Sequence, residues 1–150
     1  MRLMLYVDTS AVLPFYRSEV NSTAVEVIFL RQAGQIGLSP LVRVETASAI
    51  ARWSRMGEIT ESQARRIESA LENDIAAGRY RSVPIPVEVF DHALRWLSSR
   101  KTNLRTLDAL HLAAAAQQEC CLLTADRPLA IAANTFGVDC QILGAEADEL

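Results

Sequence analysis

Short apolar runs alternate along this chain with longer stretches in which apolar residues recur at helical spacing. The run LMLYV at 3–7 is continuously apolar, as expected for a strand buried on both faces of a sheet. Strands that alternate with helices favour a parallel sheet covered by helices on both faces. The pattern therefore predicts an α/β fold, with three α/β/α layers around a mainly parallel sheet of about five strands. The predicted strands are 3–7, 36–38, 80–83, 121–124 and 138–143.

The helices predicted between these strands are marked by their ends. The segment 21–35 has apolar residues at helical spacing, and Thr23 and Glu26 fit a capping box at its start. Ser39 supplies a hydroxyl cap, with Pro40 at the first position of the next helix. The predicted helices are a turn at 11–16 limited by Pro14, then 21–35, 39–56, 60–78 behind a capping box of Thr60 and Gln63, 86–97, 107–118 and 126–136.

Two of these helices, 39–56 and 60–78, are joined by a short loop and are predicted to form a helical hairpin. Trp53 and Met56 lie toward the end of its first helix. Exposed aromatic and methionine side chains favour interfaces, so this hairpin is a candidate contact for a second copy or another protein. Burial of Trp53 in the core is the competing interpretation.

Bulk properties narrow the class of protein. A chain of 150 residues, half of them apolar, fits one domain over 1–150. The net charge of −3 does not favour nonspecific nucleic-acid binding by the whole surface, and Lys101 is the only lysine among many arginines. Three cysteines without metal-ligand spacing indicate reduced thiols. No run approaches the ~20 apolar residues of a membrane span, and Asp8 interrupts the first run too early for a secretory signal. We therefore expect a cytoplasmic protein without a membrane partner, and a frayed acidic end at 145–150.

Four acidic residues occupy equivalent places in this pattern. Asp8 and Asp126 follow predicted strands, while Glu45 and Asp108 lie in early turns of predicted helices. In a parallel sheet, strand carboxyl ends and helix amino ends meet at one edge. Carboxylates gathered there repel one another and call for a cation, and Mg²⁺ or Mn²⁺ prefers such oxygen ligands. A bound ion of this kind activates water for phosphodiester hydrolysis without a covalent nucleophile. Ordinary helix caps and surface charges are the alternative for each acid taken alone.

Three hydroxyl residues, Thr9, Ser10 and Thr124, lie beside the predicted acidic cluster. They could hold a metal-bound water or fix Asp8. They could equally be caps or turn formers.

The basic residues near the acids allow two interpretations each. Arg105 and Arg52 are candidates for RNA-phosphate contacts, since arginine suits phosphate oxygens, or are ordinary solvated arginines. His111 lies one turn after Asp108 and is predicted to be a neutral, hydrogen-bonded histidine within the helix packing, because hard-cation sites rarely use imidazole.

Four segments, taken in order, resemble the PIN-domain family and in particular the VapC-type toxins: YVDTSAVLPFY, LVRVETASAIAR, LRTLDALHLAAA and LLTADRPLAIAA. The resemblance implies a Mg²⁺- or Mn²⁺-dependent endoribonuclease of a type II toxin–antitoxin pair. Asp8, Glu45 and Asp108 match the three core acids, Asp126 matches a fourth and more variable one, and Thr124 matches the hydroxyl residue two positions before it. The family's properties imply a homodimer, tRNA or ribosomal RNA as substrate, and a VapB antitoxin that lays a C-terminal segment across the active-site groove.

Other functions remain open at this stage. A PIN-domain nuclease could process RNA without an antitoxin, and an inert PIN-fold module could only bind RNA or protein. A phosphatase of the haloacid dehalogenase type would need an aspartate two residues after Asp8, where this chain has Ser10. A response-regulator receiver domain would need a lysine beyond a later strand, but Lys101 precedes a helix.

Overall fold

A computed structural model describes residues 4–144 of the chain. Its centre is a five-stranded sheet in the order β3-β2-β1-β4-β5, and each pair of neighbouring strands is parallel. Leu5 of β1 lies opposite Ile36 of β2 on one side and Cys121 of β4 on the other. The predicted parallel sheet is confirmed. The strands are β1 (Leu5–Val7), β2 (Ile36–Leu38), β3 (Arg81–Ser82), β4 (Cys121–Thr124) and β5 (Cys140–Ile142).

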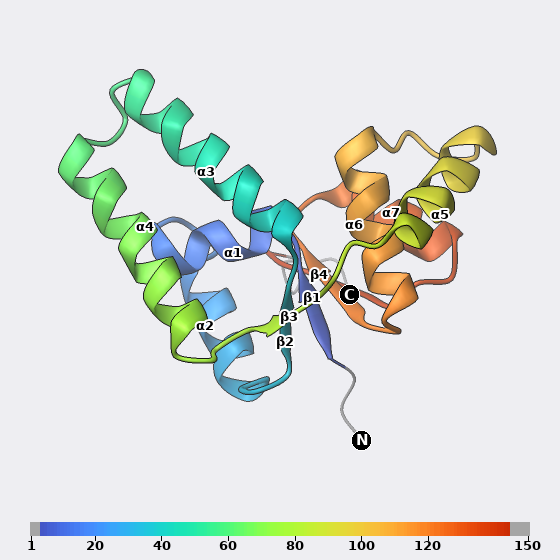
Figure 1. The fold of residues 1–150 in the computed structure, drawn as a ribbon, viewed down its shortest axis with the longest axis horizontal. Helices are drawn as coiled ribbons and strands as arrows, with labels where there is room; N and C mark the ends of the chain where they lie inside the picture. The colour runs from blue at the N-terminus through green and yellow to red at the C-terminus, as the bar shows by residue number, and fades with distance from the viewer. Residues whose placement is uncertain (1–3, 145–150) are drawn as a thin grey trace.

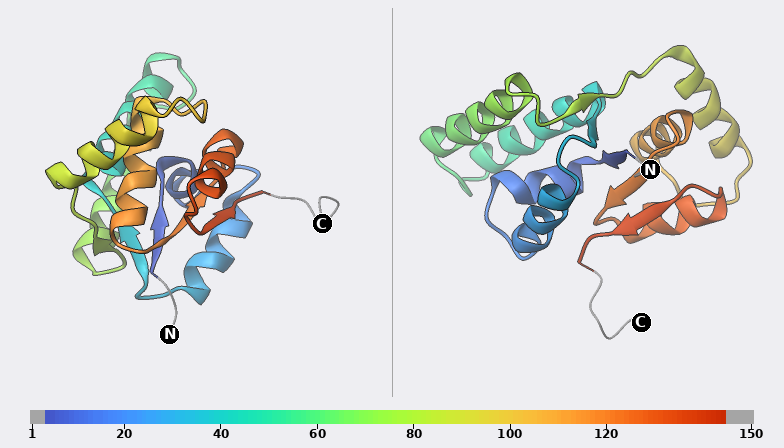
Figure 2. Two further views of the ribbon diagram at one scale, coloured as in Figure 1. Left: turned by 90° about the vertical axis from the view of Figure 1, so that its right-hand side faces the viewer. Right: turned by 90° about the horizontal axis from the view of Figure 1, so that it is seen from below.

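Helices cover both faces of this sheet (Figures 1 and 2). Side chains along β1 alternate between two cores, as the pleat of a strand requires. Tyr6 packs in a core with residues of α5, α6 and α7, whereas Leu5 and Val7 pack in a second core with residues of α1 and α2. The predicted three-layer arrangement is therefore confirmed. The helices are α1 (Thr9–Tyr16), α2 (Ser22–Arg31), α3 (Pro40–Arg55), α4 (Glu61–Ala76), α5 (Val87–Ser98), α6 (Thr106–Gln117) and α7 (Arg127–Thr135).

The strand order reverses beside β1, and this reversal locates the site. From β1 the chain proceeds outward through β2 to β3, and then returns to place β4 and β5 on the other side of β1. In open parallel sheets, ligands bind beyond the carboxyl ends of the strands at such a reversal. Asp8 follows β1 and Asp126 comes two residues after Thr124, the last residue of β4. The topology thus brings two of the predicted acids to the point where a ligand is expected.

The predicted hairpin of α3 and α4 is present and projects from the sheet (Figure 1). It has a small core of its own, which includes Ile50, Trp53 and Ile67. Trp53 is buried, and the guanidinium of Arg17 lies 4.2 Å from the centre of its ring. Met56 is exposed. Of the two interpretations of Trp53, core packing is the one that the structure supports.

Two predicted helix starts differ from the structure. The capping box of Thr23 and Glu26 is wrong, because α2 begins at Ser22 behind Asn21, and Asn21 makes no side-chain cap. The Ser22 hydroxyl instead donates to the Pro14 carbonyl and accepts from the Glu19 amide, which ties the loop before α2 to α1. Ser39 stands at the N-cap of α3, as predicted, but its hydroxyl does not cap the helix.

Several predicted boundaries also shift. The turn predicted at 11–16 is part of a longer helix, since α1 begins at Thr9 and has Pro14 inside it, and α2 stops at Arg31 because the chain turns before β2. The strands predicted at 80–83 and 138–143 shorten to Arg81–Ser82 and Cys140–Ile142, since only these residues pair in the sheet. The acidic tail at 145–150 lies outside the described residues. Within the described part of the chain, every helix is too short or too polar to cross a bilayer.

Candidate active site

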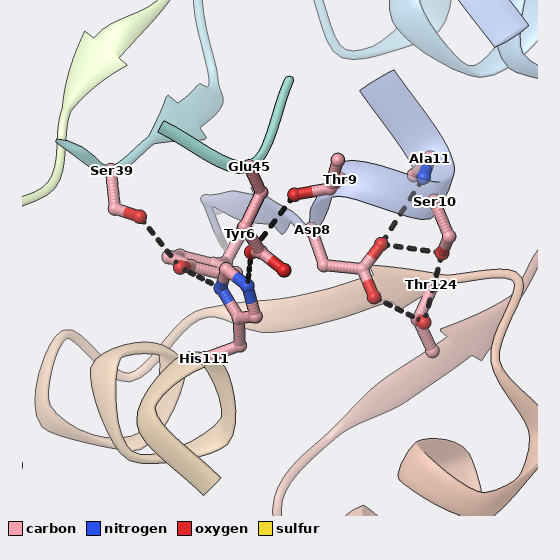
Figure 3. Close-up of polar contacts among 9 residues, drawn as sticks. All are labelled: Tyr6, Asp8, Thr9, Ser10, Ala11, Ser39, Glu45, His111 and Thr124. Atoms are coloured by element: carbon pink, nitrogen blue, oxygen red, sulfur yellow. Dashed lines mark hydrogen bonds and ion pairs between the residues drawn. The ribbon is translucent and has the colours of Figure 1, made fainter. Parts of the chain in front are cut away.

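Asp8 is held by hydrogen bonds on both of its carboxylate oxygens (Figure 3). It is the N-cap of α1, so its Oδ1 accepts from the Ala11 amide at 3.1 Å and also from the Ser10 hydroxyl at 2.6 Å. Its Oδ2 accepts from the Thr124 hydroxyl at 2.5 Å. Burial raises the pKa of Asp8, although these hydrogen bonds act in the opposite direction. A charged Asp8 is therefore costly in this position unless another positive group approaches.

The hydroxyls around Asp8 also join the two strand ends. Ser10 Oγ accepts from the Ala125 amide at 2.8 Å and lies 3.3 Å from Thr124 Oγ1. Thr124 Oγ1 accepts from the Asp126 amide at 3.0 Å. Of the two interpretations of these side chains, the structure therefore shows them fixing Asp8 and shaping the turn after β4.

Glu45 reaches the same edge from the second turn of α3. Its Oε1 accepts from the Thr9 hydroxyl at 3.0 Å and from His111 Nε2 (Figure 3). Its Oε2 has no hydrogen-bond partner among the described residues. Burial alone would raise the pKa of Glu45, but the hydrogen bond and charge of His111, helped by Thr9, outweigh it and hold that pKa below its usual value. Glu45 is thus an ionised ligand candidate with one oxygen fixed and one available.

Asp108 and Asp126 complete the group. Asp108 lies in the first turn of α6, and Asp126 is the N-cap of α7, where its Oδ1 accepts from the Leu129 amide at 3.2 Å. Burial raises the pKa of Asp108, and the charge of Asp126 is the next cause, followed by smaller effects of Asp8 and Glu45 in the same direction. The charges of all three other acids act on Asp108. The structure therefore brings the four predicted carboxylates into one electrostatic neighbourhood.

The donor set suits a hard cation. Carboxylate oxygens that follow two strands, from Asp8 and Asp126, and that lie in early turns of two helices, from Glu45 and Asp108, gather at the reversal of the sheet. Mg²⁺ or Mn²⁺ prefers such oxygens. As the side chains stand, no group of three or more histidine, cysteine, aspartate or glutamate side chains among residues 4–144 is arranged as a ready metal-ligand set. Both oxygens of Asp8 accept hydrogen bonds from hydroxyl and amide donors. The residues fit a cation once these carboxylates turn toward it.

The two arginines singled out from the sequence lie on the surface. Arg105 is at the N-cap position of α6, three residues before Asp108, and is exposed. Arg52 is exposed on α3, two turns after Glu45. Neither guanidinium forms an ion pair with another described residue. Both remain available to a phosphate, and Arg105 is the nearer in sequence to the acids.

His111 is hydrogen-bonded within the helix packing, as predicted, but its partners were not foreseen. Its Nδ1 lies 2.7 Å from the hydroxyl of Tyr6, which in turn lies 2.8 Å from the hydroxyl of Ser39. The sequence pattern predicts Tyr6 only as an apolar strand residue and Ser39 only as a helix cap. The one sequence signal was a tyrosine inside an apolar strand, because a buried phenol needs a polar partner.

Comparison with known proteins gives the class. Residues 5–134 match the family model described as the PIN domain. Ribonuclease VapC47 from Mycobacterium tuberculosis (strain CDC 1551 / Oshkosh) is 34% identical over 117 residues, which span 76% of each chain. The chain therefore belongs to the PIN-domain family, among its VapC-type members.

Solved structures agree at the level of the fold. FitAcB from Neisseria gonorrhoeae superposes with a TM-score of 0.71 at 19% identity, covering 91% of this chain and 96% of that one. The DNA-bound VapBC of Salmonella typhimurium gives 0.69 at 13% identity, covering 94% and 98%. VapC20 from Mycobacterium tuberculosis, described as a sarcin-ricin loop cleaving toxin, gives 0.66 at 15% identity, covering 85% and 94%.

Proposed function

We propose that this protein is a Mg²⁺- or Mn²⁺-dependent endoribonuclease and the toxin of a VapBC-type pair. The observation that carries the proposal is the gathering of Asp8, Glu45, Asp108 and Asp126 at the reversal of a parallel sheet, where the other three acids raise the pKa of Asp108 together with burial. Membership of the family and the relative named as a ribonuclease support the same chemistry.

Each residue of the site has a part in this reaction. The ion, when bound, supplies an activated water and neutralises charge on the scissile phosphate. Asp8, Glu45 and Asp108 would hold it, with Asp126 as a further oxygen donor. Ser10 and Thr124 orient Asp8 through its two carboxylate oxygens.

Substrate contacts fall to the exposed basic residues. Arg105, at the start of α6, is placed to bind a phosphate of the RNA, and Arg52 lies further along α3. Both guanidiniums make charge-assisted contacts to phosphate oxygens without reading the base. The pair therefore contributes affinity for RNA rather than choice of sequence.

The partners follow from the same proposal. The substrate is a structured RNA of the tRNA or ribosomal class, in keeping with the sarcin-ricin loop named for VapC20. The inhibitor is a VapB-type antitoxin, in keeping with the VapBC complexes among the structural neighbours. We infer a cytoplasmic location, because tRNA and ribosomes are found there. We infer a homodimer from the resemblance to the VapC-type toxins.

The test is cleavage of tRNA and ribosomes by the purified protein, with mapping of the RNA ends. Cleavage is expected with Mn²⁺ or Mg²⁺ and not with excess chelator. Asp8→Asn or Asp108→Asn should reduce the rate by roughly 100-fold or more, the scale of removing one electrostatic group from an active site. Asp91→Asn, at an exposed aspartate of α5, is the control and should leave the rate unchanged. Full cleavage by Asp108→Asn, or by the wild type in chelator, contradicts the proposal.

Co-expression separates the toxin from a processing nuclease. Expression alone should arrest growth, and expression with the product of a small neighbouring gene should restore it. A protein that cleaves RNA without harming growth, or whose toxicity no neighbouring gene relieves, is a nuclease without an antitoxin.

A further inference from the structure

Three buried polar side chains form a line that ends on Glu45. Ser39, Tyr6 and His111 are exposed by only 1%, 0% and 2%. The Ser39 and Tyr6 hydroxyls are 2.8 Å apart, the Tyr6 hydroxyl is 2.7 Å from His111 Nδ1, and His111 Nε2 is hydrogen-bonded to Glu45 Oε1 (Figure 3). The line crosses from β1 and the start of α3 to α6 and back to α3. It opens toward solvent only through Glu45, which is half-buried.

The proton arrangement along this line follows from its last member. Glu45 Oε1 already accepts from the Thr9 hydroxyl, and a carboxylate oxygen accepts, so His111 Nε2 is the donor in its hydrogen bond to Oε1. In the neutral ring, Nδ1 is then an acceptor and needs a donor. The Tyr6 hydroxyl lies against Nδ1 and, as a phenol, donates its proton to it. Ser39 can donate to the Tyr6 oxygen in turn.

The core does not require this line. Tyr6 stands between Leu5 and Val7 in a strand that is otherwise fully apolar, and a phenylalanine would fill the same space without a buried hydroxyl to satisfy. Ser39 directs its hydroxyl to Tyr6 rather than capping α3, the ordinary use of a serine at that position. The hydroxyls of Tyr6 and Ser39 therefore contribute neither to the apolar packing of β1 nor to the capping of α3.

We propose that Tyr6 and His111 are positioning residues for Glu45. Tyr6 holds His111 with its proton on Nε2, and His111 in turn fixes Glu45 Oε1 and leaves Oε2 to face the cation. The inference rests on the proposed function, because it takes Glu45 to be a metal ligand. Thr9 is the second donor to Oε1 and holds the carboxylate from the other side. Hydrogen bonds around a ligating carboxylate orient it, and their loss typically weakens metal binding by about 10- to 100-fold.

The direct test is binding of Mn²⁺ alone to the full chain, measured by calorimetric titration. Tyr6→Phe removes only the hydroxyl, and we expect its dissociation constant for Mn²⁺ to rise by about 10-fold. The matched control is Tyr80→Phe, which removes another buried phenol hydroxyl, one paired with Tyr16 at 2.6 Å. Tyr80→Phe should bind Mn²⁺ as the wild type does. Equal affinity in Tyr6→Phe and wild type would overturn the proposal.

Rescue by a conservative variant separates positioning from packing. His111→Gln places an amide donor toward Glu45 that does not depend on Tyr6, so it should keep Mn²⁺ affinity far better than His111→Ala. Adding Tyr6→Phe to His111→Gln should change the affinity by no more than about twofold, because the donor no longer needs a tautomer. A further 10-fold loss in the double variant would mean that Tyr6 acts through packing, and the proposal would fall.

A third measurement needs no variant to fold. Nitrogen-15 NMR of the imidazole in the wild-type protein should find the neutral ring of His111 with its proton on Nε2. A proton on Nδ1 sinks the proposal even if Tyr6→Phe cannot be purified. The outcomes are separable: if Glu45→Gln loses Mn²⁺ and the wild type cleaves RNA while Tyr6→Phe is unaffected, only the positioning role fails. A wild type that neither binds Mn²⁺ nor cleaves RNA overturns both this inference and the proposed function.

Discussion

The surroundings of two acids of the site, Asp8 and Asp108, disfavour their charged forms. Burial raises the pKa of Asp8 and Asp108, and Asp108 also carries the repulsion of Asp126. A carboxyl group whose pKa is raised on folding binds its proton more tightly in the folded state, so it lowers the stability as pH rises above its unfolded pKa. The loss is complete above the folded pKa and absent well below the unfolded one. The site thus costs stability at neutral pH when no cation is bound.

Asp108→Asn should therefore stabilise the metal-free protein while abolishing cleavage. A partly exposed charge contributes about 0.5 kcal/mol, which corresponds to a rise of roughly 1–2 °C in melting temperature at neutral pH. The gain should shrink as the pH falls toward about 4, the ordinary range of an aspartate. Thermal melts of both proteins in chelator across this pH range measure it, with Asp91→Asn as the neutral control. A lower melting temperature for Asp108→Asn at neutral pH would contradict this account.

Among the elements, those fixed by local signals were predictable from sequence and those fixed by distant partners were not. The capping box of Thr60 and Gln63 is present as predicted, because both of its hydrogen bonds lie within one turn. The box assigned to Thr23 and Glu26 failed because Ser22 binds the Pro14 carbonyl across the loop. A hydrogen bond across a loop leaves no periodic pattern of apolar residues in the sequence.

The same distinction holds for the site. The placement of the four acids at one edge could be predicted because parallel topology brings strand ends and helix starts together there. The link from Tyr6 to His111 joins residues 105 positions apart and was not visible. It depends on the parallel pairing of β4 with β1 and on the packing of α6 against Tyr6 in the same core.

Helix ends offer a prediction of their own. After α6, the Cys120 amide donates to the Ala115 carbonyl and the Glu119 amide to the Ala116 carbonyl, which is the Schellman pattern. Glu119 adopts a left-handed φ of 52° there, whereas the equivalent position after α7 is Gly137, with φ 72°. A side chain in this conformation is strained and a glycine is not.

Glu119→Gly should accordingly raise the free energy of unfolding. The relieved strain exceeds the added freedom of the unfolded chain by about 0.5–1 kcal/mol, or roughly 1–4 °C in melting temperature. Gln118→Gly, one residue earlier at an ordinary φ of −97°, is the matched control and should destabilise the protein. Chemical denaturation of the three proteins compares them, and a less stable Glu119→Gly would show that the strain is absent.

For the whole molecule, the proposed homodimer needs an apolar surface. The hairpin tip does not supply a row of apolar side chains, because Met56 is exposed but Trp53 is buried. Helix α5 does: Val87, Phe90 and Leu94 follow one another at helical spacing and are 66%, 50% and 63% exposed. A two-fold axis beside α5 would bury this stripe against its own copy, since a symmetric interface uses the same patch twice.

Phe90→Glu should convert the dimer to a monomer. A charge placed in the middle of an apolar interface would be buried without a partner in both subunits, at a cost that outweighs the contact. Light scattering with size-exclusion chromatography gives the mass directly. Ile131→Glu, at another exposed apolar residue, on α7, should leave the mass unchanged. A Phe90→Glu protein with the wild-type mass would show that α5 does not form the dimer interface.

The hydrogen bond between Asp8 and Thr124 joins residues 116 positions apart. During translation, a ribosome that has made α4 has already synthesised Asp8 and Glu45, but Asp108, β4 and Asp126 do not yet exist. The nascent chain can therefore carry half of the acids without a site to hold them. A synthesis that stalls before β4 therefore leaves a fragment without the assembled site, and under the proposed function the chain would acquire its activity only when the last strands have joined the first.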